Sequence, residues 1–270
     1  MSKAGRIRVG IGGWSFEPWR ETFYPPDTPQ ARELEYASRH VTSIEINSTF
    51  YRLQKPAVYA KWRDATPEDF VFSLKAPRYL VQRTELASMG PSLERFIGSG
   101  IAELGAKLGP ILWQFTPAQR FESVDFGKFL ELLPNAVGKI PLRHALEVRH
   151  KSFLSPEFLA LARARRAVVV FVDDAKYPCC ADITGDFVYA RLRQCLAGEA
   201  TGYPKAALRH WQDTARTWAR GGVAADLPRV EPDARVAATP REVFVYFING
   251  AKERAPAAAQ ALIAELGASR

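Results

Sequence analysis

Short apolar runs rich in β-branched residues alternate with amphipathic segments along this chain, and this alternation is the strongest constraint on its fold. Eight of the runs have the length and composition of strands. They cover residues 8–12, 43–46, 70–75, 111–114, 144–148, 167–172, 187–191 and 243–247.

The segments between these runs have the apolar spacing of helices. They cover residues 31–40, 56–65, 92–108, 124–133, 156–165, 205–220 and 256–266. Several of them open with proline at or near the first helical position, where proline is favoured because its missing N–H would have no partner anyway.

Eight strands separated by helices within 270 residues predict an α/β protein, a single (β/α)8 TIM-like barrel that occupies residues 1–270 as one domain. A doubly wound open sheet is the alternative. Two irregularities are expected. Residues 173–186 are too short and too broken by proline and cysteine for a good helix after strand six, and residues 221–241 predict a long exposed loop before strand eight.

The composition is that of a globular protein, with 47% hydrophobic and 24% charged residues and no apolar run long enough to cross a bilayer. Three cysteines, two of them adjacent, do not suit a disulfide framework, so we expect a cytoplasmic protein, with a monomer favoured. The net charge of +8 favours anionic partners, although a soluble basic surface would explain it equally well.

Polar residues gather where the predicted strands stop. In a parallel barrel the carboxyl ends of all strands meet at one face, where sites form, so these side chains are expected to converge. The run from Ser43 to Arg52 carries the clearest example, since Glu45 and Asn47 alternate with isoleucines before two aromatic residues. The expected set comprises Trp14, Glu45, Asn47, Tyr51, Lys75, Gln114, Glu147, Arg149, His150, Asp173, Arg191, Arg193 and Asn249.

The predicted catalytic residues are the carboxylate and imidazole members of this set: Glu45, Glu147, Asp173 and His150. The predicted substrate-binding residues are Trp14, Asn47, Tyr51, Lys75, Gln114, Arg149, Arg191, Arg193 and Asn249. A carboxylate would act as general acid or base while arginine and lysine hold an anionic group. Each ion pair would equally suit a purely structural role, and a lone histidine beside an arginine is more often hydrogen-bonded scaffold.

No cofactor is predicted. A site with several zinc ions is not expected, because only His150 among the four histidines lies at a predicted strand end on the open face. Mg²⁺ or Mn²⁺ held by Glu45, Glu147 and Asp173 stays open. A glycosidase that uses Glu45 and Glu147 as its carboxylate pair also stays open, with Trp14 and Tyr51 as stacking residues for a sugar or a base.

Several motifs resemble those of the YecE-like family, a domain of unknown function that carries the number 72. They are Gly12-Gly-Trp-Ser15, Glu45-Ile-Asn-Ser-Thr-Phe-Tyr-Arg52, Phe72-Ser-Leu-Lys-Ala76, Glu147-Val-Arg-His150 and Val245-Tyr-Phe-Ile-Asn249. The resemblance spans nearly the whole chain and implies a TIM-like barrel, without an established activity.

The chain departs from the family pattern at two positions. Arg193 and Gln194 stand where the family usually has His-Gly after strand seven, and Gly250 stands where a second asparagine is common. An arginine in place of a histidine replaces a titratable ring with a permanent cation, which puts in doubt any proton transfer at that position and favours anion binding by Arg193.

The sequence supports two functions. The first is an enzyme of the hydrolase or lyase type that acts on a phosphorylated or otherwise anionic small molecule, with carboxylate acid/base chemistry and an Arg/Lys clamp. The alternative is a nucleic-acid-binding or nuclease-like protein that uses its basic surface and stacks a base on Trp14 or Tyr51. No membrane partner is expected.

Overall fold

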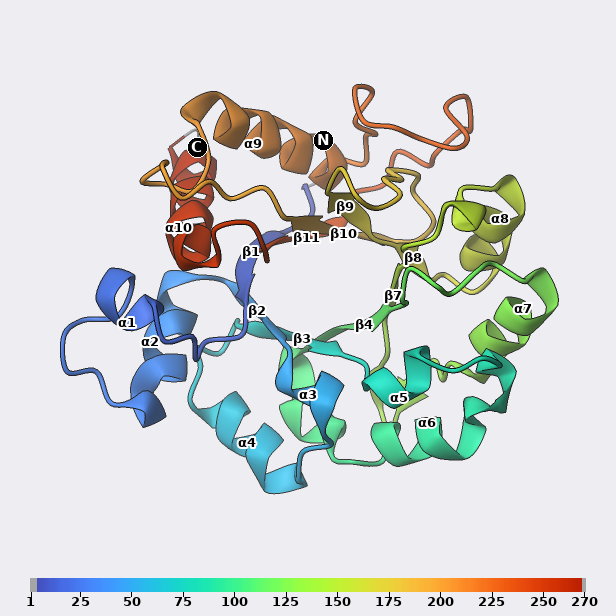
Figure 1. Ribbon diagram of the computed structural model, residues 1–270, viewed down its shortest axis with the longest axis horizontal. Coiled ribbons are helices and arrows are strands. Elements are labelled where there is room, and N and C mark those ends of the chain that lie inside the picture. Colours follow the sequence, from blue (N-terminus) through green and yellow to red (C-terminus); the bar gives the residue numbers. More distant parts are fainter. Residues whose placement is uncertain (1–3, 269–270) are drawn as a thin grey trace.

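The computed structural model describes residues 4–268 and has a nearly closed barrel of parallel strands ringed by helices (Figure 1). The strands of the barrel are β1 (Ile7–Gly12), β2 (Ser43–Ile46), β3 (Val71–Lys75), β4 (Leu108–Gln114), β7 (His144–Glu147), β8 (Val168–Val169), β9 (Phe171–Asp173), β10 (Phe187–Leu192) and β11 (Glu242–Phe247). Their order in the sheet is β8-β7-β4-β3-β2-β1-β11-β10-β9, and all pairs are parallel.

The two ends of this sheet, β8 and β9, are successive parts of one extended segment. Only Val170 separates them, and its N–H still donates to the carbonyl oxygen of Leu146 in β7 at 3.0 Å. Since β8 pairs with β7 and β9 pairs with β10, the segment completes the ring. The eight-strand TIM-like barrel predicted from the sequence is therefore confirmed, and the open-sheet alternative is wrong.

The helices surround the strands. The α-helices are α1 (Trp19–Thr22), α2 (Glu33–His40), α3 (Ser48–Tyr51), α4 (Pro56–Asp64), α5 (Arg78–Val81), α6 (Gly90–Ile97), α7 (Ser123–Leu132), α8 (Pro156–Ala164), α9 (Lys205–Ala219) and α10 (Ala255–Gly267). Short 3-10 helices are η1 (Gln30–Arg32), η2 (Leu86–Met89), η3 (Ile101–Lys107), η4 (Lys151–Phe153) and η5 (Lys252–Arg254). A two-stranded antiparallel ribbon, β5 (Ala136–Val137) and β6 (Ile140–Pro141), lies outside the barrel.

The predicted irregularities are present. Residues 174–186 form no helix, and residues 221–241 form neither helix nor strand. The second of these loops is partly rather than fully exposed. Asp182 of the first loop accepts hydrogen bonds from the N–H groups of Val230 and Glu231 and so ties the second loop to the first. The single helix predicted for residues 92–108 is instead divided into α6 and η3, since Gly100 between them adopts φ of 111°.

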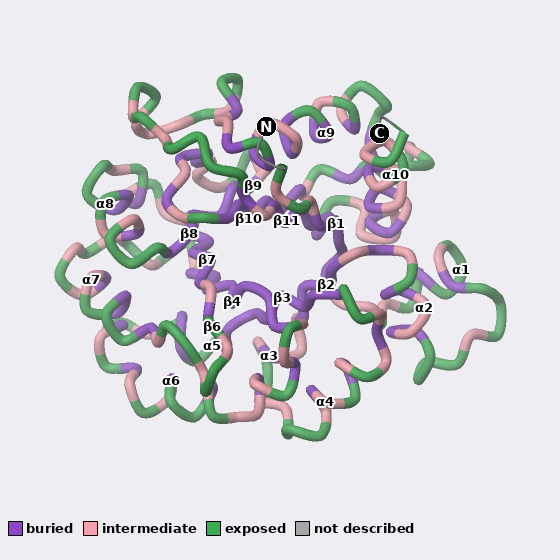
Figure 2. Tube along the Cα trace, turned by 180° about the vertical axis from the view of Figure 1, so that it is seen from behind, coloured by how far each residue is buried: buried purple, intermediate pink, exposed green. Residues whose placement is uncertain are grey.

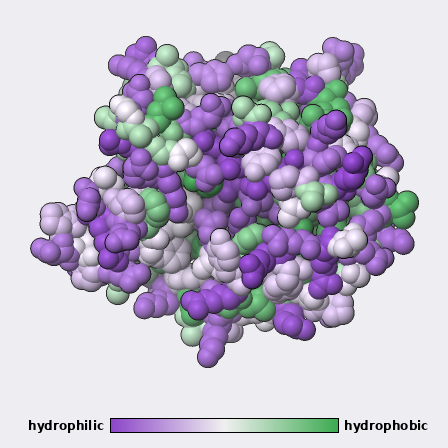
Figure 3. All heavy atoms as spheres, in the orientation of Figure 1, coloured by the Kyte–Doolittle hydropathy of each residue, from purple (hydrophilic) through white to green (hydrophobic). Residues whose placement is uncertain are grey.

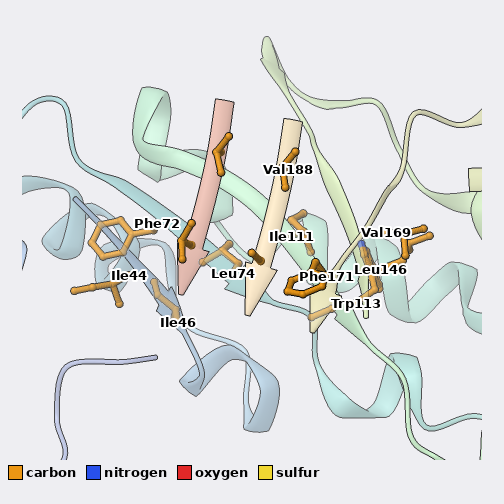
Figure 4. Packing of buried hydrophobic residues seen from close by; sticks show 14 of the residues in the cluster. Ile44, Ile46, Phe72, Leu74, Ile111, Trp113, Leu146, Val169, Phe171 and Val188 are labelled. Carbon is orange, nitrogen blue, oxygen red and sulfur yellow. The ribbon is translucent and has the colours of Figure 1, made fainter. Parts of the chain in front are cut away.

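Two layers of apolar side chains hold the fold together. Along each strand the residues alternate between the inside of the barrel and the helices, as successive side chains in a strand must. Ile44, Ile46, Phe72, Leu74 and their neighbours face the helices (Figure 4). Figure 2 shows the consequence, a buried ring of strands inside helices whose outer faces are exposed.

The inside of the barrel is apolar in part and polar at both ends. Phe187, Tyr189, Phe244 and Tyr246 fill its middle. At the amino-terminal end, Glu242 forms ion pairs with Arg8 and with Arg143, which precedes β7.

Among residues 4–268, no helix combines the length and the apolar character needed to span a bilayer.

Candidate functional site

The carboxyl ends of the strands surround a cavity of about 800 Å³, here called the mouth cavity. Its wall comes from β1, β2, β3, β4, β10 and the residues that follow β7 and β11. Hydrophilic side chains surround a hollow near the middle of the face seen in Figure 3, and α3 lies beside the opening of the barrel in Figure 1. The lining includes every residue that the sequence predicted to bind substrate: Trp14, Asn47, Tyr51, Lys75, Gln114, Arg149, Arg191, Arg193 and Asn249.

The charged residues of the lining all carry the same sign. They are Arg52, Lys75, Arg149, Arg191, Arg193 and Lys252, and among residues 4–268 no aspartate or glutamate lines the cavity. Like charges gathered around a partly desolvated hollow repel one another, and a bound anion relieves that repulsion. The mouth cavity is therefore electrostatically suited to an anion.

Arg191 lies at the floor of the cavity and joins two carboxylates from separate strands. Its Nε and Nη2 donate to the two oxygens of Glu45 at 3.0 and 2.9 Å, and its Nη1 donates to Glu147. All three side chains are buried, with the two glutamates fully inaccessible. The predicted convergence of β2, β7 and β10 on one site is what the structure has.

Further polar side chains complete the hydrogen bonding of these carboxylates. The Tyr189 hydroxyl donates to Glu45 at 2.7 Å and lies 2.8 Å from the Ser73 hydroxyl. Gln114 donates from Nε2 to both oxygens of Glu147, at 2.9 and 3.0 Å. Buried charges cost free energy unless they are paired and hydrogen-bonded, and here both glutamates are.

The protonation of Glu147 follows from these contacts. Burial alone would raise the pKa of Glu147, but the charges of Arg191 and Arg149 and the hydrogen bond from Gln114 outweigh it and lower the pKa to about 2. Burial likewise opposes the charge of Arg191, and the two glutamates more than compensate and raise its pKa. Glu147 and Arg191 are therefore both ionised near neutral pH.

Arg149 and Arg193 stand on the wall of the cavity. Arg149 donates from Nε to Glu147 at 2.8 Å, and both guanidinium groups lie over the ring of Tyr177, at 4.6 and 5.2 Å from its centroid. The side-chain amide of Asn249 is oriented so that its NH2 group donates to the carbonyl oxygen of Ile248. Its oxygen then accepts a hydrogen bond from Nη2 of Arg193 at 2.7 Å.

Arg193 has spare donors. Its Nε lies 3.2 Å from a carboxylate oxygen of Asp174, but the angle is wrong for a hydrogen bond. Nε and Nη1 are both buried and without a hydrogen-bond partner among the described residues. Buried N–H groups normally have partners, so these two indicate a place where a ligand would accept hydrogen bonds.

Lys75 ends β3 and places its ammonium group in the cavity 4.0 Å from the centroid of the Phe50 ring. The carbonyl oxygen of Lys75 accepts a hydrogen bond from the Thr49 hydroxyl at 2.7 Å, which fixes α3 against the end of the strand. Burial, reinforced by the nearby charge of Arg191, lowers the pKa of Lys75 to about 8.

The two aromatic residues expected to stack on a ligand, Trp14 and Tyr51, differ in how firmly neighbouring side chains hold them in place. Trp14 is half-buried and packs edge-on against Trp62 at 5.4 Å between ring centroids, so its position is fixed. Tyr51 is 68% exposed and touches Phe50 edge-on at 5.3 Å. Trp14 therefore offers a rigid wall, and Tyr51 stands at the rim.

The four residues predicted to be catalytic do not line the cavity. Glu45 and Glu147 lie behind Arg191, as described above. Asp173 accepts a hydrogen bond from Gln194, and burial raises its pKa. The Nδ1 of His150 accepts from the N–H of Ser152 at 3.1 Å and lies 2.8 Å from the Ser152 hydroxyl, so this ring caps η4.

Sequence reasoning missed several lining residues in the segments that follow the strands. Ser15, Arg52 and Gln54 belong to the segments after β1 and β2, and Lys252 begins η5. Arg52 and Lys252 follow predicted site residues by one and three positions, so nearness in sequence was the available signal.

The residues from Ala4 to Ala268 contain no group of three histidine, cysteine, aspartate or glutamate side chains placed to hold a metal ion. In particular Glu45, Glu147 and Asp173, which the sequence left open for Mg²⁺ or Mn²⁺, do not form such a group.

The fold and the site together define a TIM-like barrel protein with a cationic cavity at the carboxyl ends of its strands. The chain belongs to the family described as "Protein of unknown function DUF72", whose sequence model matches residues 8–270. The resemblance to the YecE-like family is thereby confirmed.

Curated relatives carry names from the same family. The chain is 31% identical over 157 residues to the UPF0759 protein YunF of Bacillus subtilis (strain 168), which is 56% of this chain and 54% of YunF. It is 28% identical over 151 residues to the UPF0759 protein YecE of Escherichia coli (strain K12), or 55% of this chain and 50% of YecE. The matches thus span about half the length of these relatives.

Solved structures agree with the fold. A DUF72 family protein from Thermotoga maritima MSB8 superposes with a TM-score of 0.71 at 23% identity, over 97% of this chain and 99% of that one. A DUF72 family protein from Enterococcus faecalis V583 gives 0.66 at 17% identity, over 97% and 98%.

Proposed function

We propose that this protein is an enzyme that binds a small molecule carrying a phosphate or carboxylate group in the mouth cavity and acts on it there. The observation that carries the proposal is the cationic lining, in which Arg193 keeps two buried N–H groups without partners. A phosphate or carboxylate would accept those hydrogen bonds and balance the surrounding charge.

The dimensions of the cavity favour a metabolite-sized ligand. Its volume of about 800 Å³ lies within the range of small-molecule pockets, which is roughly 300–1,000 Å³. The half-buried Trp14, which lines the same cavity as the arginines, would supply an apolar surface for the uncharged part of the ligand.

The two glutamates take a different role in this proposal from the one expected from sequence. Glu45 and Glu147 position Arg191 and keep it charged, since their oxygens are already engaged and lie outside the lining. Acid/base catalysis by either carboxylate stays a prediction that their burial does not favour. A reaction of the hydrolase or lyase type is retained.

Anion binding is tested with inorganic pyrophosphate and titration calorimetry. We compare the wild type with Arg193→Gln, which removes the spare donors, and with Arg95→Gln, which removes an exposed arginine of α6 outside the cavity. Hydrogen bonds to charged groups contribute about 1.5–3 kcal/mol, so Arg193→Gln should weaken binding by roughly 10- to 100-fold while Arg95→Gln leaves it unchanged.

Arg191 is not the residue to remove, because its loss would leave two buried carboxylates unpaired and would unfold the barrel rather than report on a ligand. Equal affinities in the wild type and in Arg193→Gln, or no binding of pyrophosphate by the wild type, would contradict the proposal.

A further inference from the structure

Lys75 differs from the arginines on the floor and wall of the mouth cavity. Arg191 and Arg149 both form ion pairs with Glu147, and Arg193 has Asp174 within ion-pair distance. Lys75 forms no ion pair within residues 4–268, although it is only 8% exposed. Its ammonium group lies over the face of the Phe50 ring, 4.0 Å from the ring centroid.

The surroundings of Lys75 disfavour its charged form. Arg191 from β10 and Arg149 after β7 repel the ammonium group, whereas Glu45 and Glu147 attract it. Both glutamates are already neutralised by the arginines, so desolvation dominates, and the pKa falls to about 8. At pH 8 the unprotonated fraction of Lys75 is then roughly a hundredfold larger than that of an ordinary lysine. A lysine desolvated beside another cation is a known arrangement for an amine nucleophile.

We propose that Lys75 is the catalytic nucleophile of this site and forms an imine with an aldehyde or ketone group of the anionic substrate. This inference rests on the proposed function, because the arginines of the cavity hold the acidic group of that substrate. The substrate class is thus narrowed to small carbonyl compounds that bear a phosphate or carboxylate.

The step balances without a further reactant. The unprotonated Nζ forms a bond to the carbonyl carbon, and the carbonyl oxygen leaves as water with the two protons of the amine. Once protonated, the imine withdraws electrons and accepts the electron pair of a bond broken at the neighbouring carbon. That chemistry belongs to lyases, one of the two reaction types retained above.

Lys252 is an internal comparison. It also lines the cavity, and burial lowers its pKa. Its ammonium group lies over the rings of Phe16 and Trp19, at 4.2 and 5.6 Å from their centroids, and it comes from η5 rather than from a strand. Because Lys252 lies outside the ring of strand ends, we expect Lys75 to be the one that reacts.

The probe for this proposal is pyridoxal 5′-phosphate, which carries both a phosphate and an aldehyde. The protein is incubated with it between pH 6 and pH 9, reduced with borohydride, digested and mapped by mass spectrometry. We expect the label mainly on the peptide that contains Lys75, rising as the pH passes through about 8, as the unprotonated fraction does. Lys75→Arg, which keeps the charge, should lose this label, and Lys252→Arg should keep it.

Label spread evenly over the lysines, or concentrated on Lys252, would overturn the assignment of Lys75. Competition with pyrophosphate separates this failure from that of the proposed function. If pyrophosphate binds the wild type and Lys75 is not labelled, only the imine is wrong. If pyrophosphate does not bind and Lys75 is not labelled, both are wrong. Selective labelling of Lys75 that pyrophosphate suppresses supports both.

Discussion

At the scale of single residues, the feature that most affects stability is the group formed by Glu45, Arg191 and Glu147. Three charges have been removed from water, which is costly, and only their mutual pairing with good geometry offsets that cost. Removal of one member leaves the others buried without compensation. A substitution of any of these three residues is therefore expected to change the stability of the fold before it reports on ligand binding.

Glu147→Gln should lower the free energy of unfolding by about 3–5 kcal/mol near neutral pH, because it breaks a buried ion pair. The folded-state pKa of Glu147, about 2, lies below that of an unfolded glutamate, so its stabilising contribution is complete above the unfolded pKa. The contribution declines as the pH falls from the unfolded value towards about 2. Chemical denaturation between pH 7 and pH 3.5 should show the wild type and the variant converging.

Glu94→Gln, which alters an exposed carboxylate of α6, is the matched control and should leave stability nearly unchanged at every pH. A constant difference between wild type and Glu147→Gln across this range would mean that Glu147 is not held ionised by Arg191.

The sequence indicated which residues lie near the mouth but not how deep each one lies. Glu45 and Lys75 both follow apolar residues near strand ends, and both were expected at the surface of the site. In the structure Glu45 pairs in register with Ser73, two residues before Lys75, which is the final residue of β3. Depth depends on the stagger between strands, which a single sequence does not contain.

At the scale of elements, the strands were predictable because they are short apolar runs rich in β-branched residues. Within each strand the side chains alternate between two faces. Phe187, Tyr189 and Arg191 face the inside of the barrel, whereas Val188 and Leu192 belong to the layer beneath the helices. The division of the predicted helix at residues 92–108 was not foreseen, although glycines lie within it. Apolar spacing continues across that break, so the periodicity alone did not mark it.

Gly10 of β1 is a sharp test of packing inside the barrel. A Cβ atom at this position would lie 2.2 Å from the carbonyl oxygen of Ser43 in the neighbouring strand and 2.9 Å from the ring of Tyr246. Because a backbone atom cannot move without disturbing the sheet, Gly10→Ala should destabilise the protein by roughly 1–3 kcal/mol, as overpacking does. Thermal unfolding followed by circular dichroism measures this.

Gly127 in the middle of α7 offers the opposite outcome for the same substitution. Its nearest neighbour to a new Cβ would be Leu161 at 3.9 Å, an ordinary contact. Alanine is the better helix former by about 1 kcal/mol, so Gly127→Ala should raise the melting temperature. If both variants behaved alike, the tight approach of β1 to β2 would be wrong.

At the scale of the whole molecule, the positive charge is consistent with two hypotheses, binding of a small anion and binding of nucleic acid. The net charge of +8 favours nucleic acid as well as small anions, and the exposed Tyr51 beside Arg52 would allow a base to stack. The mouth cavity concentrates part of this charge in one hollow, whereas backbone binding requires it to follow a track over the surface. Salt dependence distinguishes the two.

We expect pyrophosphate binding to weaken by less than about tenfold between 50 and 200 mM salt, since it occupies one pocket. A protein that contacts six to ten phosphates of a duplex loses about 10³–10⁵ in affinity over that range. Fluorescence anisotropy with a labelled oligonucleotide supplies the comparison. Tight oligonucleotide binding with the steep dependence, together with weak pyrophosphate binding, would favour the nucleic-acid alternative.

Arg191 of β10 both lines the mouth cavity and braces the barrel, because it forms ion pairs with Glu45 of β2 and Glu147 of β7. A related protein that binds a different ligand would still need this arginine and both glutamates for its barrel to be stable. Conservation of these three residues among related proteins would therefore reflect the requirements of the fold rather than a shared ligand. Divergence in chemistry should instead be sought at Lys75 and Arg193, which the brace does not require.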